Sequence, residues 1–209
     1  MNSILLIDKP AGITSFDVIR RLRRTLGIKK MGHAGTLDPF ATGLLIVATG
    51  TATKQISHYM GMEKEYEALF EFGKISTTYD VDGTITEADA DLSKISREKF
   101  EEALPSFIGE ILQTPPAFSA KKINGQRAYD LARKGIAVVL EPRKVLVRSI
   151  EILAWSWPLV RVRIRCGKGT YIRSIAHDLG QKLGRGAYVK ELRRTAIGEF
   201  RVENAQGLD

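Results

Sequence analysis

Two stretches in the last third of the chain alternate between apolar and polar positions. In LVRVRIRC (159–166), Val160, Val162 and Ile164 occupy every second position, and arginines stand between them. Successive side chains of a strand point to opposite faces of a sheet, so the pattern predicts a strand with one apolar face. The stretch KVLVRSIEIL (144–153) alternates in the same way and predicts a second strand.

Helical spacing of apolar residues appears in three other segments. The first is expected to begin at a cap on Thr14 or Ser15 and to end at Gly27. A second, amphipathic helix is predicted from Ser96 to Phe107, and a third over residues 171–183. The apolar stripes of the first and third helices are Phe16, Ile19, Leu22 and Leu26, and Ile172, Ile175, Leu179 and Leu183.

The remaining segments predict strands and turns. ILLI near the start and KEYEALFEF (64–72) suit strands, whereas TTYDVDGTITE (77–87) reads as a polar loop around an Asp-Gly turn. FSAKKINGQRAYDLARKG (118–135) places an Asn-Gly turn in basic surroundings and then a short helix. Helices and strands mix without a repeating rhythm, so we expect one α+β domain over residues 1–209, built on a largely antiparallel sheet.

Composition narrows the classes of molecule that the protein could bind. Apolar residues make up 44% of the chain, enough for a real core, and the formal net charge is +8. Residues 62–110 carry 5 basic and 13 acidic side chains, so the positive excess lies toward both ends of the chain. Such an excess favours a polyanion, most often nucleic acid, although a merely basic globular protein is an equal alternative on charge alone.

Several kinds of site are excluded by the residues present. Cys166 is the only cysteine, so neither an intrachain disulfide nor a cysteine cluster for zinc can form. The three histidines lack metal-ligand spacing, and no phosphate-binding loop, GxSxG or HExxH motif occurs. The first residues resemble neither a signal peptide nor a membrane span, so we expect a cytoplasmic protein.

Asp38 stands out in the stretch GHAGTLDPFATGLL (32–45). The first 61 residues hold only three acids, and Asp17 already suits a place near the positive end of a helix. Pro39 biases Asp38 away from helical geometry. A structural Asp-Pro turn explains this pattern locally, and a catalytic carboxylate is the alternative.

The longer motifs decide between these readings. GHAGTLDPFATGLL closely resembles the catalytic motif of the TruB family of pseudouridine synthases, which act on uridine-55 of tRNA. The resemblance extends over residues 4 to 200. Its further motifs are LLIDKPAGITSFDVIR, KEYEALFEFG, PPAFSAKKINGQRAYDLARKG, CGKGTYIRSIAHDLG and LRRTAIGEF.

This resemblance implies the pseudouridine synthase fold, a mixed and largely antiparallel sheet flanked by helices. It also implies a reaction that breaks the N1–C1′ bond of uridine, turns the base and joins C5 to C1′, without cofactor or metal. Asp38 matches the essential aspartate. Whether such a carboxylate attacks covalently or removes the 2′ proton stays open.

Other roles carry over by position. Tyr66 matches the tyrosine that packs on the target uracil, and Leu192 an apolar residue of the uracil pocket. Tyr171 and Arg173 match residues beside the target nucleotide, where Arg173 would pair with Asp38 and hold it ionised. His33 matches the residue that fills the stack when the uracil swings out.

The implied partner is the T-arm stem-loop of tRNA, recognised by shape and phosphate contacts. The arginines of the first helix can equally form a solvated face, as such runs usually do. Our candidates for the phosphate-facing surface are Lys9, Arg20, Arg24, Lys121, Lys122 and Arg133.

The chain also departs from the family. Many bacterial relatives continue into a C-terminal PUA or similar RNA-binding domain, which we do not expect here. We expect a monomer that needs neither guide RNA nor a protein partner. Two rivals are a non-catalytic tRNA-binding or folding protein with this fold, and a guide-RNA-dependent relative that modifies ribosomal RNA.

Overall fold

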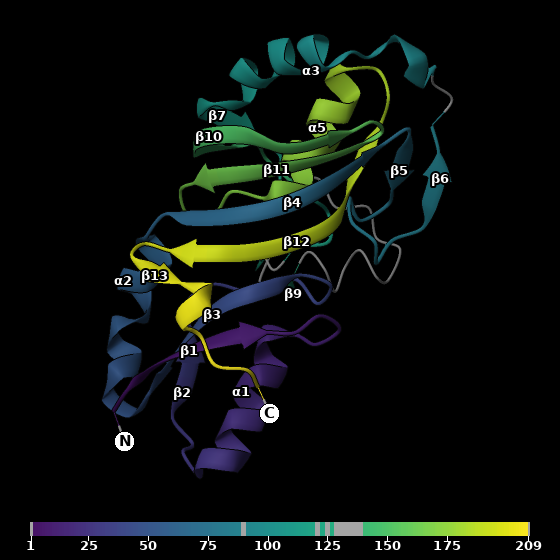
Figure 1. The fold of residues 1–209 in the computed structure, drawn as a ribbon. Coiled ribbons are helices and arrows are strands. Elements are labelled where there is room, and N and C mark those ends of the chain that lie inside the picture. Colours follow the sequence, from purple (N-terminus) through teal and green to yellow (C-terminus); the bar gives the residue numbers. More distant parts are fainter. Residues whose placement is uncertain (1, 89–90, 120–121, 124–125, 128–139, 209) are drawn as a thin grey trace. The chain divides into compact units, whose positions relative to one another are not determined.

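The computed structural model describes residues 2–88, 91–119, 122–123, 126–127 and 140–208 (Figure 1). The chain forms two compact units. The first comprises Met1–Ala68, Arg163–Lys168 and Glu191–Asp209, and the second comprises Leu69–Val162 and Gly169–Lys190. Strands β4 (Lys64–Phe72), β11 (Leu159–Cys166) and β12 (Ala187–Ile197) contribute residues to both units.

A mixed sheet forms the frame of the first unit. Its strand order is β1 (Ile4–Lys9), β3 (Thr42–Thr49), β12, β4 and β11, with β2 (Met31–His33) also paired to β3 and β13 (Phe200–Arg201) to β12. The pair β1–β3 is antiparallel, whereas β12 runs parallel to β3 with Arg194 opposite Gly43. The expected N-terminal strand is therefore confirmed.

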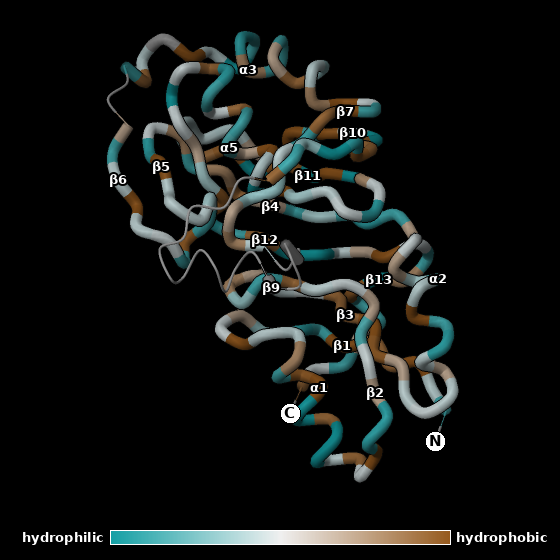
Figure 2. Tube along the Cα trace, turned by 180° about the vertical axis from the view of Figure 1, so that it is seen from behind, coloured by the Kyte–Doolittle hydropathy of each residue, from teal (hydrophilic) through white to brown (hydrophobic). Residues whose placement is uncertain are grey.

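Helix α1 (Ser15–Leu26) begins as its sequence predicts. The Thr14 side chain accepts a hydrogen bond from Asp17 N, and the Asp17 carboxylate accepts one from Thr14 N, which makes a capping box. Gly27 ends the helix in the left-handed region, at φ 66°. Figure 2 shows apolar and polar positions alternating along this helix.

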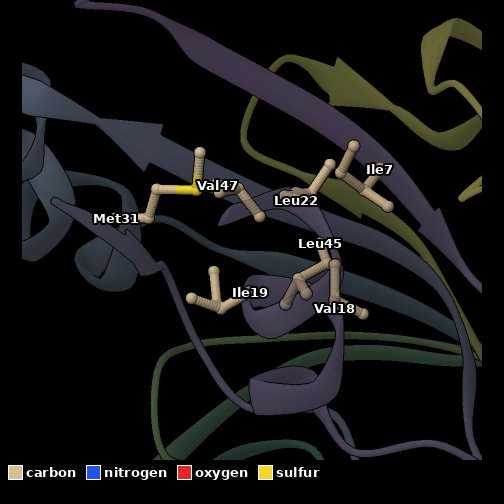
Figure 3. Packing of buried hydrophobic residues seen from close by; sticks show 7 residues of the cluster. All are labelled: Ile7, Val18, Ile19, Leu22, Met31, Leu45 and Val47. Carbon is tan, nitrogen blue, oxygen red and sulfur yellow. The ribbon is translucent and has the colours of Figure 1, made fainter. Parts of the chain in front are cut away.

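The predicted apolar stripe of α1 is only partly correct. Phe16 is 55% exposed and Leu26 40% exposed, whereas Val18, which the stripe omitted, is fully buried. The helix therefore packs on a face turned toward Val18, in a cluster with β1, β2 and β3 (Figure 3). The buried residues of this cluster are Ile7, Val18, Ile19, Leu22, Met31, Leu45 and Val47.

A second cluster holds the opposite side of β3. It anchors Ala34 and Leu44, which flank the Asp38 segment, against residues near the C-terminal end of the sequence. Its buried members are Ala34, Leu44, Ile46, Ile197 and Val202. Burial of an aliphatic side chain of this size contributes about 1.5–3 kcal/mol, so both ends of the Asp38 segment are fixed in the core.

In the second unit the strand order is β12, β4, β11, β10 (Arg143–Ser156) and β7 (Gly109–Gln113). Two further antiparallel pairs are β5 (Lys74–Ser76) with β6 (Ile85–Glu87), and β8 (Lys122–Ile123) with β9 (Gln126–Arg127). The alternating stretches form β10 and β11 as predicted, and the α+β class is confirmed.

The helices of the second unit differ more from expectation. Helix α5 (Ile172–Lys182) buries its predicted stripe. The helix predicted from Ser96 to Phe107 is an α-helix only over α3 (Arg97–Ala103), and it continues as a 3₁₀ turn over Leu104–Phe107. Pro105 lies at the start of this turn and cannot supply the amide hydrogen bond of an α-helix interior.

The other helical elements of the described residues are short. They are α2 (Ile56–Gly61) and 3₁₀ turns at Gly50–Gln55, Leu92–Lys94 and Val202–Asn204. Among the residues that the structure describes, no helix has both the length and the apolar character needed to cross a membrane.

Candidate active site

The Asp38 segment is a tight turn tied to the start of α1. Leu37 N donates to Ser15 Oγ at 2.9 Å, and Ser15 Oγ donates back to Leu37 O at 3.2 Å. On the other side, Gly12 N donates to Pro39 O at 2.9 Å. Asp38 itself is half-buried, and its carbonyl accepts from Ala41 N at 3.1 Å. Hydrogen bonds to both neighbours thus fix the backbone that carries the carboxylate.

Lys9 supports the same turn from below the surface. Its side chain is fully buried, and its ammonium donates to the carbonyls of Pro10 at 2.8 Å, Ile13 at 2.8 Å and Pro39 at 3.2 Å. A buried ammonium needs such acceptors, because leaving water without them is costly. The structure therefore gives Lys9 a part in holding the Asp38 turn, whereas the sequence suggested a phosphate contact.

Tyr66 and Leu192 belong to the same unit as Asp38. Leu192 is buried on β12, and Tyr66 is half-buried on β4. Burial raises the pKa of the Tyr66 hydroxyl, nearby Arg194 opposes this, and the charge of Asp38 adds a smaller increase. Asp38 and Arg194 therefore both lie within electrostatic reach of the phenol.

Arg194 is a residue that the sequence reasoning missed. It is 1% exposed, and its guanidinium donates to Leu44 O at 2.8 Å and to Gly35 O at 3.1 Å. Its charge also opposes the rise in the pKa of the nearby Tyr66 hydroxyl. A signal was present: strand alternation places residue 194 on the same face as Leu192, and an arginine on a buried face needs a reason.

His33 ends β2, directly before the Asp38 segment. Burial lowers the pKa of its imidazole, and the positive charge of Arg194 lowers it further, while a backbone hydrogen bond with Gly35 opposes both. The ring is therefore held in its neutral form near pH 7, which suits packing against a nucleobase.

The second unit contains Arg173 at the start of α5. Its Nη1 lies 2.9 Å from Asp80 Oδ2, and both side chains are buried. The guanidinium also donates to Thr78 O at 3.0 Å and to Phe118 O at 3.1 Å. Asp80, which the sequence suggested was part of a polar turn, is thus a buried ion-pair partner.

The turn that carries Asp80 is itself tightly held. Tyr79 adopts φ 65°, a left-handed conformation that is uncommon for a residue with a side chain. Its ring stacks on His177 of α5, with centroids 3.8 Å apart. Asp80 also accepts hydrogen bonds from the Thr78 hydroxyl and from Asp82 N. The direction of the Asp80 carboxylate is therefore set by several contacts.

Tyr171 precedes α5 and occupies its N-cap position. Its backbone N donates to Gln113 Oε1 at 2.8 Å, and Gln113 Nε2 donates to Tyr171 O at 3.0 Å. The buried Gln113 side chain of strand β7 therefore satisfies both backbone groups of Tyr171. The predicted pair of Arg173 with Asp38 joins residues of different units and stays a prediction.

The exposed face of α1 is strongly basic. A hollow of about 420 Å³ on it is lined by Ile13, Asp17, Arg20, Arg21 and Arg24. Arg20 pairs with Asp17, whereas Arg24 has no ion-pair partner among the described residues. Two of the six candidates for phosphate contact therefore share one surface.

Besides Lys9, the remaining three candidates belong to the stretch 118–135 of the sequence. Lys121 and Arg133 are outside the described residues. Lys122 is described only through its backbone, in the pair β8–β9. These strands flank the predicted Asn-Gly turn, whose own two residues, like the short helix expected after them, lie outside the described part.

Within the described ranges, no three or more histidine, cysteine, aspartate or glutamate side chains are grouped so that they could hold an ion. The implied independence from cofactors stays a prediction.

Two family models match the chain in succession. One, described as TruB family pseudouridylate synthase (N terminal domain), covers residues 23–172. The other, described as tRNA pseudouridylate synthase B C-terminal domain, covers residues 173–208. The prediction of a single catalytic domain over 1–209, without a PUA domain, stays a prediction.

Comparison with individual proteins is consistent with these family models. A protein of Solibacter usitatus named tRNA pseudouridine synthase B is 49% identical over 209 residues, which are 100% of this chain and 71% of that protein. One of the same name from Aquifex aeolicus is 47% identical and is covered to 73%. A solved structure titled "Crystal Structure of a Cbf5-Nop10-Gar1 Complex" has a TM-score of 0.75 at 32% identity, covering 98% of this chain and 52% of that one.

Proposed function

Because the chain belongs to the TruB family of pseudouridylate synthases, we propose that it isomerises uridine-55 in the T-loop of tRNA to pseudouridine. Relatives named tRNA pseudouridine synthase B match along its whole length, so the enzyme is an isomerase that acts on uridine in tRNA. The observation that carries the proposal is the geometry of the Asp38 turn. Hydrogen bonds to Leu37 and Pro39 fix its backbone, and the Asp38 side chain stays partly exposed to solvent.

Asp38 is the catalytic residue of the proposed reaction. Its carboxylate either attacks the substrate or removes the 2′ proton, and both routes need a group that is ionised and held still. Arg173 would keep the carboxylate ionised by pairing with it. Support comes from the Arg173 guanidinium itself, which Asp80 and two carbonyls hold in one orientation.

The remaining residues receive the target nucleotide. The ring of Tyr66 packs on the uracil, Leu192 forms an apolar wall, and Tyr171 lies beside the nucleotide. His33 takes the place of the base in the RNA stack, which offsets part of the few kcal/mol that unstacking costs. The neutral state of the His33 ring supports this role, because a neutral imidazole loses little on leaving water.

Phosphate contacts come from the basic surface of α1, with Arg20 and Arg24, and from Lys121, Lys122 and Arg133. Lys9 serves indirectly by holding the Asp38 turn. We further propose that the protein acts as a monomer in the cytoplasm, without guide RNA or protein partner. The single cysteine, which is buried, fits a reducing compartment.

The decisive experiment compares wild type, Asp38→Asn and Glu203→Gln on an unmodified tRNA transcript with no other RNA or protein added. Glu203 is an exposed acid of the same unit, so its amide variant controls for loss of a charge. Pseudouridine is mapped by carbodiimide labelling and primer extension, because the isomerisation leaves the mass unchanged.

We expect a stop at uridine-55 with wild type and Glu203→Gln only, while Asp38→Asn still binds tRNA. Normal turnover by Asp38→Asn would overturn the catalytic assignment. A wild type that binds tRNA but yields no stop would favour the non-catalytic binding protein. Activity that appears only after a guide RNA is added would favour the guide-dependent alternative.

A further inference from the structure

Arg194 is the most unusual buried charge near the Asp38 segment. At 1% exposure it is the largest fully buried side chain of the described residues. Among those residues, no carboxylate forms an ion pair with it. A guanidinium stays charged at any ordinary pH, so burying it without an acid is costly and calls for a function or a compensating network.

Its hydrogen bonds reach both ends of one segment. Nη2 donates to Gly35 O at 3.1 Å, three residues before Asp38, and Nε donates to Leu44 O at 2.8 Å, six residues after it. The same guanidinium lies close enough to Tyr66 for its charge to lower the pKa of the phenol, against the larger effect of burial. One planar group therefore joins the two ends of the segment 35–44 beside the tyrosine proposed to contact uracil.

The backbone of residue 194 lies very close to β3, which fixes where its side chain begins. Arg194 lies opposite Gly43 where β12 runs parallel to β3. A Cβ at residue 43 would meet Arg194 O at 2.3 Å and Arg194 N at 2.8 Å, so only glycine allows the strands to approach this closely. Gly43 also has φ 103°, a conformation that a side chain disfavours. Two positions far apart in sequence are thus matched to each other.

A lysine could not replace the guanidinium of Arg194. The guanidinium carries five donors in a fixed plane, which lets it serve two carbonyls in different directions while it lies near the Tyr66 phenol. An ammonium at the same site is a single point on a flexible stem, so it would lose at least one of the two carbonyls. The arrangement therefore depends on the shape of the side chain as well as on its charge.

We propose that Arg194 is a positioning residue of the pseudouridine synthase reaction. It fixes the two ends of the segment that carries Asp38 and the hydroxyl of Tyr66, so that carboxylate and ring meet the uridine in one geometry. This inference rests on the function proposed above, and it adds a residue that acts through Asp38 and Tyr66 without touching the reacting atoms.

The first test compares Arg194→Lys with Arg193→Lys, its neighbour on β12. Arg193 is partly exposed and pairs with Asp8, and a lysine there keeps the charge and one contact to this carboxylate, so Arg193→Lys is a matched control with a small expected effect. Single-turnover rates are measured with enzyme in excess, and tRNA affinity is measured separately on the same preparations. Thermal unfolding establishes that each variant is folded.

We expect Arg194→Lys to lower the single-turnover rate about 100-fold, because a displacement of about 1 Å at a reacting group costs this much. Its tRNA affinity should stay within about twofold of wild type, since the side chain is buried away from RNA. A purely structural role predicts lower thermal stability with an unchanged rate for the folded protein.

The second test is a double-mutant cycle with Tyr66→Phe, which keeps the aromatic ring and removes the hydroxyl. We expect Tyr66→Phe alone to lower the rate about tenfold, and Arg194→Lys to have a clearly smaller effect in that background than in wild type. Equal effects in both backgrounds would contradict a route through Tyr66. If Arg194→Lys does not fold, a wild-type rate for Tyr66→Phe overturns the proposal.

The outcomes separate the two proposals. If wild type forms no pseudouridine at uridine-55, the proposed function itself has failed. If wild type is active and Arg194→Lys keeps a rate within about threefold of Arg193→Lys, only the positioning role is overturned.

Discussion

The two units hold their buried charges in different ways. In the first unit, Lys64 and Arg194 direct their donors to backbone carbonyls. In the second unit, Arg173 pairs with Asp80, and Glu71 pairs with two lysines. Carbonyls satisfy a cation's hydrogen bonds but cancel little of its charge, whereas a carboxylate does both.

This difference has a consequence for chemistry. Burial lowers the pKa of His33 and of Lys64, the latter to about 8, and the positive charge of Arg194, with which no carboxylate of the described residues pairs, lowers both further. In the second unit, carboxylates compensate the charges of Arg173, Lys74 and Lys190.

The strongest test of the comparison breaks the ion pair of the second unit. Arg173→Met or Asp80→Asn alone should lower the free energy of unfolding by about 3–5 kcal/mol, because each leaves its partner's charge buried. The double variant should cost clearly less than the sum of the two single changes. Urea unfolding measures all three, and strict additivity would show that the pair is not coupled.

A buried cation of the first unit that bonds only to carbonyls should contribute less to the free energy of unfolding. Lys9→Met removes the donor from three carbonyls and should lower the free energy of unfolding by about 2–3 kcal/mol. Lys29→Met, at an exposed position, is the control and should change stability by less than about 0.5 kcal/mol. A loss for Lys9→Met as large as that for Arg173→Met would erase the distinction between the units.

Salt dependence tests whether the remaining positive charge faces RNA. Arg24→Gln, on the basic surface of α1, should weaken tRNA binding and reduce the slope of log affinity against log salt by about 1. Lys190→Gln in the second unit should leave that slope unchanged, because Lys190 already pairs with Glu71. Affinities measured at several salt concentrations decide, and equal slopes for both variants would contradict the expectation.

The smallest expected effect concerns Asp178, an acid of the second unit without an ion pair among the described residues. Burial raises its pKa from 3.8 to about 6. The folded state therefore favours the protonated acid, and the cost of burying the charge grows as pH rises from about 4 to 6 and persists above that.

Asp178→Asn should accordingly stabilise the fold by about 1 kcal/mol at pH 7.5, a value reduced because the side chain is only half-buried. Its advantage should vanish below about pH 4, where the acid is protonated in both states. Thermal unfolding of both proteins across this range tests the sign. An advantage that grows toward low pH would contradict it.

Local sequence patterns were sufficient for elements whose neighbours are close in the chain. Alternation gives β11 directly, because the buried positions of a strand repeat every second residue. The capping box of α1 involves only Thr14 and Asp17, which are three residues apart. The Asp38 motif could likewise be recognised from one continuous stretch.

Other features depend on partners far away in sequence. The exposure of Phe16 and Leu26 follows from the face that α1 turns toward β2 and β3, because only part of the five apolar residues among the twelve of this helix can lie on that face. Asp80 is buried because Arg173, which is 93 positions later, neutralises it. Neither fact can be read from periodicity, since both are decided by tertiary contacts.

The parallel pairing of β12 with β3 has a consequence for the order of folding. Arg194 bonds Leu44 across 150 positions, and β12 must enter between β3 and β4 before the first unit is complete. At ordinary synthesis rates, on the order of 10 s separates the emergence of these two strands from the ribosome. Contacts of such long range also close slowly. The residues of the Asp38 turn are therefore synthesised early. Arg194 can bond Leu44 and fix the segment only later, when nearly all of the described chain exists.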